Sequence, residues 1–190
     1  TFAQDGGTLL NQGSLTVNNS TITGGATGYG GAINSNSSAT LVINNSLFTG
    51  NHGSTNGGAI RSRGTAVINN STIAGNHAVG IGGGISAPEG SITINNSIIT
   101  GNTAALDANI EGSYTGSFNL IGADAKFVNL VGATLNTPTN AGDYRLSPYS
   151  AAIDAGNNSL TSSGTTDVAG NPRFVNDVDV PDTGSGTAPL

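Results

Sequence analysis

The sequence predicts an all-β protein: a single-stranded, right-handed parallel β-helix with coils of about 25 residues and irregular C-terminal coils or a cap. A ten-residue phrase recurs at 15–24, 41–50, 66–75 and 92–101. A second phrase, Gly-Gly-X-aliphatic, runs in phase with the first and ends at Leu9, Ile33, Ile60 and Ile85. Apolar and polar residues alternate inside each copy, which is the period of a half-buried strand. The right hand follows from the general rule for parallel crossovers.

Each coil is expected to contain three short strands separated by bends. In the second coil these strands would cover residues 40–44, 46–49 and 58–62. The Asn-Asn pair between the first two strands predicts a tight bend, because Asn tolerates left-handed backbone angles and bonds to its own main chain. A longer connection is expected from Gly50 and Asn51 to the next Gly-Gly phrase.

A coil this thin cannot bury its own apolar side chains, so equivalent residues must stack at the interstrand spacing of about 4.8 Å. Three aliphatic columns are expected, at residues 9/33/60/85/110, 17/43/68/94 and 22/48/73/99. Asn51, Asn76 and Asn102 are expected to form a structural ladder whose amides hydrogen-bond along the axis. Gly25 takes the equivalent place in the first coil.

Composition restricts the partners and the location. The chain has 30 Gly, no Cys, no Met, 8% charged residues and a net charge of −6. The lack of Met indicates a processed or excised piece, and this Lys-poor acidic profile favours a secreted bacterial surface protein. We therefore expect an extracellular or cell-surface location. Neither nucleic acid nor an anionic membrane is an expected partner, and no membrane-inserting stretch is seen.

The chain divides unevenly into two parts of one domain. The strict repeat ends after Ile110, and only two of the 11 acidic residues lie within the first hundred. We expect regular β-helix coils over 1–112, and irregular coils with a C-terminal cap over 113–190.

Two resemblances to known families follow from these motifs. Gly-Gly-Ala-Ile at 30–33 and 57–60, with Phe-Thr-Gly-Asn at 48–51, resembles the GGAI and FxxN repeats of polymorphic outer-membrane protein passengers. Those passengers are β-helical surface adhesins. The ordered phrases at 119–122, 146–148, 152–156 and 167–173 are similar to the closing segment of choice-of-anchor Q proteins, which are bacterial pectin-lyase-like β-helices. This chain inserts 149–151 into the family's Ser-Pro-Ala-Ile-Asp phrase.

The second resemblance also assigns residues to the cap. Asp154 and Asp167 belong to the matched phrases and are expected to hold the cap together, with Arg173 as an ion-pair partner. The family has no single established activity, so the resemblance implies a fold and a location rather than a reaction.

Catalysis is the first functional alternative, because many parallel β-helices cleave polysaccharides. Glycoside hydrolysis needs two carboxylates about 5–9.5 Å apart, and residues 8–88 contain none. Lyase chemistry needs a basic residue, and Lys126 is the chain's one Lys. We predict no catalytic residues, while a site around Asp107, Glu111 and Asp124 stays open.

Two groups of residues were considered as metal sites. Asp177, Asp179 and Asp182 gather three carboxylates in six residues of turn-like sequence, which is a pattern that Ca²⁺ prefers; a solvated acidic tail is the alternative. His52 and His77 occupy equivalent positions and could share a metal, but solvated loop histidines are the favoured interpretation. No cofactor is required, and Ca²⁺ is the one cofactor that the sequence allows.

The expected function is that of a non-enzymatic extracellular structural or adhesive protein. Arg61 and Arg63 lie two apart on a strand and could contact an anionic glycan or a neighbouring subunit, with a solubilising role as the alternative. Open strand edges favour end-to-end association of copies into a filament, unless an upstream segment covers the first coil. The alternatives are a carbohydrate-active lyase or hydrolase, and a glycan- or ice-binding face with Thr16, Thr21 and Thr23.

Overall fold

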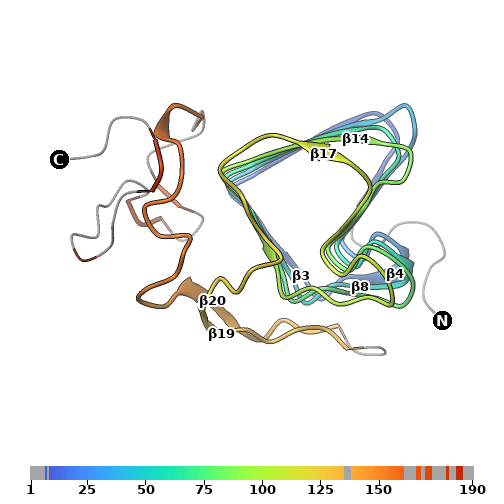
Figure 1. Ribbon diagram of the computed structural model, residues 1–190. Helices are drawn as coiled ribbons and strands as arrows, with labels where there is room; N and C mark the ends of the chain where they lie inside the picture. Colours follow the sequence, from blue (N-terminus) through green and yellow to red (C-terminus); the bar gives the residue numbers. More distant parts are fainter. Residues whose placement is uncertain are drawn as a thin grey trace.

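The computed structural model of the protein describes residues 7, 9–134, 138–160, 166, 167, 170–172, 179 and 183–185. The chain forms a right-handed parallel β-solenoid, which confirms the predicted fold class. Figure 1 looks along the axis, so that the successive coils overlap and the core lies inside a roughly triangular outline with one indented side.

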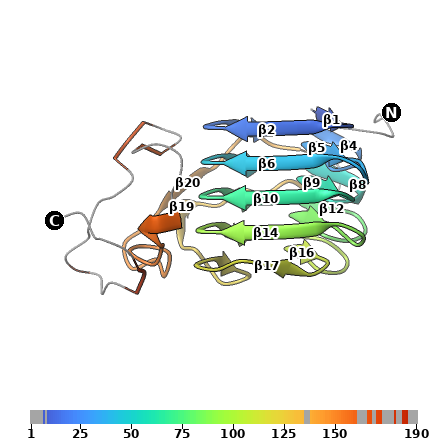
Figure 2. The same ribbon diagram turned by 90° about the horizontal axis from the view of Figure 1, so that it is seen from above.

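Four parallel sheets run along the axis. Sheet A contains β1 (Leu9–Asn11), β5 (Ile33–Ser35), β9 (Ile60–Ser62), β13 (Ile85–Ser86) and β16 (Ile110–Glu111). Sheet B contains β2 (Ser14–Asn18), β6 (Thr40–Asn44), β10 (Thr65–Asn69), β14 (Ser91–Asn95) and β17 (Tyr114–Thr115), which Figure 2 shows stacked in this order. Sheet C contains β3 (Thr21–Thr23), β7 (Leu47–Thr49), β11 (Thr72–Ala74), β15 (Ile98–Thr100) and β18 (Leu120–Ile121). Sheet D contains β4 (Ala26–Tyr29), β8 (His52–Asn56) and β12 (His77–Ala78).

The register of these sheets confirms the three predicted columns. Ile68 pairs with Ile43 on one side and with Ile94 on the other. Ile73 lies between Phe48 and Ile99 in the same way. The third column pairs successive members of the set Leu9, Ile33, Ile60, Ile85 and Ile110. The middle members of all three columns are fully buried and form one continuous core.

The predicted Asn-Asn bend joins sheet B to sheet C. The second Asn of each pair has a left-handed backbone, with φ of 47°, 48°, 50° and 48° at Asn19, Asn45, Asn70 and Asn96. The Ser that follows each pair closes the bend, because its hydroxyl donates to the carbonyl of the first Asn, as Ser46 does to Asn44 at 2.8 Å. Strand β7 therefore begins at Leu47 rather than at the expected residue 46.

Two parts of the predicted coil differ from the structure. The expected strand at 58–62 is shorter, because the Gly-Gly pair at 57–58 forms the turn that precedes β9. The long connection was expected to be a bend between strands, but it forms sheet D. Sheet D lacks an aliphatic alternation, because its buried positions include Thr27, His52 and Ala78, so period-2 analysis does not detect it.

The described residues after β18 lie beside the solenoid rather than across its last coil. Strands β19 (Phe127–Asn129) and β20 (Asp143–Leu146) form an antiparallel pair. Between them the chain runs back along the axis: Ala133 donates its N–H to the carbonyl of Gly75 at 2.8 Å, and Thr139 donates to that of Gly50 at 2.8 Å.

The repeated Gly that ends each ten-residue phrase permits this return path. Gly50 and Gly75 have φ of 61° and 67°, in the left-handed region that favours Gly. A Cβ at Gly50 would also collide with the carbonyl of Thr139, and one at Gly75 would crowd Val131 and Tyr144. The Gly column therefore provides both the turn between sheets C and D and room for the returning chain.

Candidate functional site

The outer face of sheet A carries a row of side chains, one from each coil. Alternation along each strand puts the aliphatic residue inside and its successor outside. The register stacks these successors in the order Leu10, Asn34, Arg61, Ser86 and Glu111. The row therefore changes from apolar at the first coil to acidic at the last, with Arg61 in the middle.

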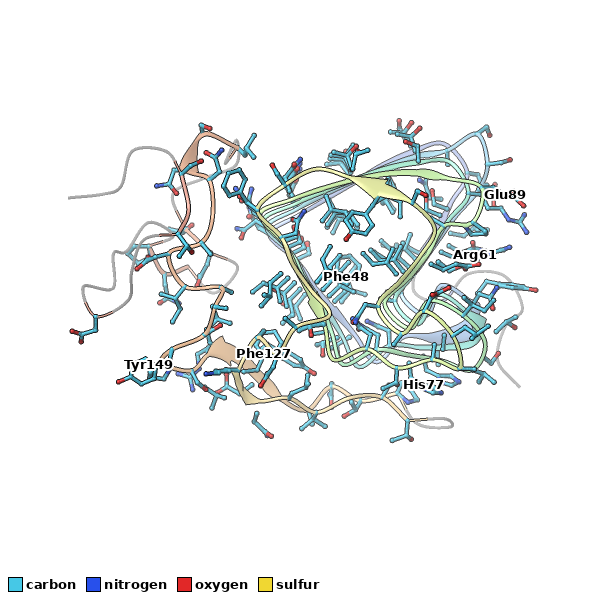
Figure 3. The ribbon with its side chains drawn as sticks, viewed as in Figure 1. Phe48, Arg61, His77, Glu89, Phe127 and Tyr149 are labelled. Atoms are coloured by element: carbon cyan, nitrogen blue, oxygen red, sulfur yellow. The ribbon has the colours of Figure 1, made fainter. Side chains whose placement is uncertain are left out.

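Arg61 lies over an aromatic ring from the neighbouring sheet. Its Cζ is 4.2 Å from the ring centroid of Tyr29, which is the last residue of β4. Figure 3 shows Arg61 and Glu89 on the same side of the solenoid, pointing away from the core that Phe48 marks. Burial and the charge of Arg63 lower the pKa of Arg61, while Tyr29 and the nearby acids oppose that shift. The guanidinium thus combines a cation–π contact with partial burial.

Several polar atoms of this face are buried without a hydrogen-bond partner among the described residues. They are Asn34 Oδ1, Arg61 Nε and Arg63 Nε. Asn34 is only 4% exposed. A buried polar group normally has a partner, since its desolvation is otherwise uncompensated. An acceptor and two donors on one face suit a ligand that carries hydroxyl or carboxylate groups.

The Asn ladder lies inside the solenoid, at the turn between sheets C and D. Asn51 Nδ2 donates to Asn76 Oδ1 at 2.9 Å, and Asn76 Nδ2 donates to Asn102 Oδ1 at 2.9 Å. The same oxygens accept the main-chain N–H of Asn51 and Asn76 at 3.0 Å. Asn51 Oδ1 accepts the N–H of Gly25, and Asn109 Oδ1 accepts from Asn102 at the other end. These residues tie the coils together and have a structural role.

The expectation that His52 and His77 are solvated loop residues is wrong, because each begins a strand of sheet D, and His77 is half-buried. His52 begins β8 and is 1% exposed. Its ring stacks on that of His77, with centroids 5.4 Å apart and an interplanar angle of 13°. His77 Nδ1 lies 2.8 Å from the hydroxyl of Thr103. Burial lowers the pKa of both imidazoles; for His52, the nearby His77 lowers the pKa further, and a hydrogen bond to the backbone of Thr134 opposes the shift.

The acids considered for catalysis lie on separate elements. Asp107 is exposed in the turn before β16, with φ of 49°. Glu111 belongs to β16 and accepts a hydrogen bond from the hydroxyl of Ser86. Asp124 is exposed beyond β18, where it accepts the N–H of Lys126 at 2.8 Å.

Half of the residues expected to bind calcium or to hold the cap lie outside the described residues. Asp177, Asp182 and Arg173 fall outside the described residues, and Asp179 is exposed in a turn. In the described part of the chain no group of three or more His, Asp or Glu side chains could hold a metal ion.

The two cap acids organise local turns. Asp167 accepts from the main-chain and side-chain nitrogens of Asn171, at 2.8 and 3.2 Å. The carbonyl of Asp154 accepts the N–H groups of Thr183 and Gly184. Asp167 therefore acts through its carboxylate and Asp154 through its main-chain carbonyl, both within the C-terminal segment at the side of the solenoid.

Sequence reasoning missed Tyr29 and Asn34. Asn34 follows directly after an aliphatic column residue, so its outward position was available from the alternation. Tyr29 lies in sheet D, which the aliphatic pattern did not detect.

No family profile, curated protein or solved structure matches this chain. None of the helices in the described residues is long and apolar enough to cross a membrane.

Proposed function

We propose that this chain is a non-enzymatic structural or adhesive β-solenoid of the bacterial exterior, and that its copies associate head to tail. The supporting observation is that the apolar columns continue into both terminal coils. Leu9, Leu15 and Ile22 of the first coil are only partly buried against the core, as are Ile110 and Ile121 of the last. A following coil would complete their burial.

The strand edges of the two terminal coils are complementary. Strands β1, β2 and β3 pair on one side with β5, β6 and β7, while β16, β17 and β18 pair with β13, β14 and β15. No described residue pairs with the opposite edge of either set. Both sets are parallel and share one outline, so a second copy would continue the sheets as the next coil does. Such an unlike contact generates an open filament when its rotation does not close.

The test is the size distribution of the full chain at increasing concentration, by analytical ultracentrifugation and electron microscopy. The proposal expects rods that lengthen with concentration. Leu15→Asp should shorten them, because it puts a charge into the end of a column. Thr16→Asp, on the exposed face of the same strand, is the matched control and should leave them unchanged. A monodisperse monomer at high concentration would overturn the proposal.

A second function, glycan binding, is favoured by the buried unpartnered atoms of sheet A. Asn34 Oδ1 could accept from a sugar hydroxyl, and the guanidinium groups of Arg61 and Arg63 could donate to a uronic acid carboxylate. Binding of oligouronides and of neutral oligosaccharides is measured by calorimetry. Asn34→Ala and Arg61→Ala should abolish binding, whereas Arg145→Ala, in the exposed hairpin, should not. Equal loss in all three variants, or no binding at all, would reject this function.

A further inference from the structure

The corner between sheets B and C carries a column of asparagines that face outward. It consists of the second Asn of each Asn-Asn pair: Asn19, Asn45, Asn70 and Asn96. Their shared left-handed backbone gives them equivalent positions in successive coils. Asn45 Nδ2 donates to Asn19 Oδ1 at 2.6 Å, and Asn96 Nδ2 donates to Asn70 Oδ1 at 3.2 Å. One N–H of each donating amide is thereby used along the column.

The other N–H of the same two amides holds the C-terminal segment. Asn96 Nδ2 donates to the carbonyl of Asn157 at 2.8 Å, and Asn96 Oδ1 accepts the main-chain N–H of Asn157 at 2.8 Å. Asn45 Nδ2 donates to the carbonyl of Thr166 at 3.1 Å. All three bonds reach main-chain atoms, and those of Asn96 engage both polar groups of one residue, as a neighbouring β-strand would.

The first Asn of each pair behaves differently. Asn44 Nδ2 donates to Asn18 Oδ1, and Asn69 Nδ2 donates to Asn44 Oδ1, at 2.9 and 3.0 Å. These amides form a ladder along sheet B and are not hydrogen-bonded to the described C-terminal residues. The two Asn of one pair therefore make different contacts: the first bonds along the ladder, and the second also bonds the C-terminal segment.

The described residues of the C-terminal segment bury little side-chain surface. None of the described residues from 151 onward is buried, and Leu160 is 36% exposed. Asn157, the residue that Asn96 binds, also holds an outer layer of chain. It forms a β-bridge with Ser185, and Asn158 donates its N–H to the carbonyl of Ser185 at 2.9 Å. Detachment at Asn96 would thus release both layers.

We propose that the second-Asn column is a main-chain binding site for polypeptide, and that its resident ligand is the C-terminal segment around Asn157 and Thr166. The site recognises the peptide groups of its ligand rather than its side chains. It latches the segment along the side of the solenoid and away from the two end coils. This inference does not depend on head-to-tail association, since it concerns contacts within one copy.

The test uses the full chain and Gly variants, because Gly keeps the left-handed backbone and removes only the amide. Hydrogen exchange by NMR follows the amide of Asn157. Asn96→Gly should accelerate its exchange on the order of tenfold or more and should expose residues 151–160 to a protease. The amides of β14 should keep their protection. Asn19→Gly is the matched control: it belongs to the same column but is hydrogen-bonded neither to Asn96 nor to a described C-terminal residue, so the exchange of Asn157 should not change.

A second pair of variants separates main-chain from side-chain recognition. Asn157→Ala keeps the N–H and carbonyl and should leave the segment as protease-resistant as in the wild type. Asn157→Pro removes the N–H and should release it. Unchanged exchange in Asn96→Gly, or equal release in Asn157→Ala and Asn157→Pro, would overturn the proposal.

Discussion

The coils and the C-terminal segment differ in how many side chains they bury and in the contacts that hold them. In the coils each inward residue meets its equivalents above and below, so Ile43, Ile68 and Ile94 are all fully buried. Beyond residue 121 the described residues contain just three that are buried: Ala125, Ala133 and Ser150. Repetition gives a thin unit its neighbours, whereas a segment without a repeat must attach to the surface that the repeats already present.

The attachment uses polar groups that the coils offer at equivalent positions. The carbonyls of Gly50 and Gly75 accept from the returning chain, and the amides of Asn45 and Asn96 hold the last segment. Hydrogen bonds of this kind add less stability than a buried aliphatic side chain. We therefore expect the C-terminal segment to open locally at a lower free energy than the coils.

The largest expected effect tests the core of the coils. Ile68→Asp puts an unpaired carboxylate between Ile43 and Ile94 and should destabilise the protein by about 4 kcal/mol or more. Val128→Asp is the matched change in the C-terminal region, where the side chain is 52% exposed. It should cost at most about 0.5 kcal/mol. Thermal and denaturant melts measure both, and similar losses would contradict the contrast between the two regions.

The next effect concerns the polar ladder inside the coils. Asn76 is fully buried; its Nδ2 donates to the carbonyl of Phe48 and to Asn102, and its Oδ1 accepts twice from Asn51. Asn76→Ala leaves those buried partners unsatisfied and should cost about 2–4 kcal/mol. Asn44→Ala, which removes one rung of the half-exposed outer ladder, should cost about 1 kcal/mol or less. Denaturant melts of both variants would show whether the inner ladder contributes more to the free energy of unfolding than the outer ladder does.

The regular coils were predictable because the same sequence pattern recurs in each of them. One column residue such as Ile68 is ambiguous alone, but four copies in phase determine the strand, its inward face and its register. The Asn-Asn bend followed from backbone chemistry in the same way, and the positive φ of Asn45 and its equivalents confirms it.

The remaining features depend on contacts that do not repeat. Sheet D is buried through Ala, Thr and His52, so it carries no aliphatic alternation. His52 also forms a hydrogen bond with the backbone of Thr134, which is 82 residues away in the sequence and belongs to the returning chain. Arg61 stacks on Tyr29 only because a neighbouring sheet exists there. The repeated Gly at 50 and 75 was visible in the sequence. The sequence did not indicate that another segment of the chain would pass over these glycines.

The stacked imidazoles predict how stability changes with pH. Unfolded His has a pKa of about 6.5, and burial lowers the folded pKa of both His52 and His77. The unfolded chain then binds more protons, so the free energy of unfolding should fall as the pH drops below about 6.5 and through the lower folded pKa values. Melts between pH 7.5 and 4.5 measure this slope. His52→Gln should flatten it, and an unchanged slope would show that other groups cause it.

The smallest expected effect comes from the ion pair of the hairpin. Arg145 Nη2 lies 2.6 Å from Asp143 Oδ2, with side chains 80% and 30% exposed. Hydrogen bonds from Arg145 lower the pKa of Asp143. That carboxylate favours folding above its unfolded pKa, and its contribution disappears as the pH falls through the lower folded value.

Exposed pairs of this kind often contribute nothing measurable, because solvent screens them. Arg145→Ala should therefore return the pKa of Asp143 toward its usual range, as followed by NMR titration, without a measurable change in the melting temperature at neutral pH. His52→Gln is the comparison from the solenoid, since it should change the pH dependence of the melt and leave Asp143 unaffected. A fall in melting temperature for Arg145→Ala as large as that of Asn76→Ala would show that the hairpin unfolds with the coils. The two regions would then form one cooperative unit, because the loss of an exposed contact in one would be transmitted to the other.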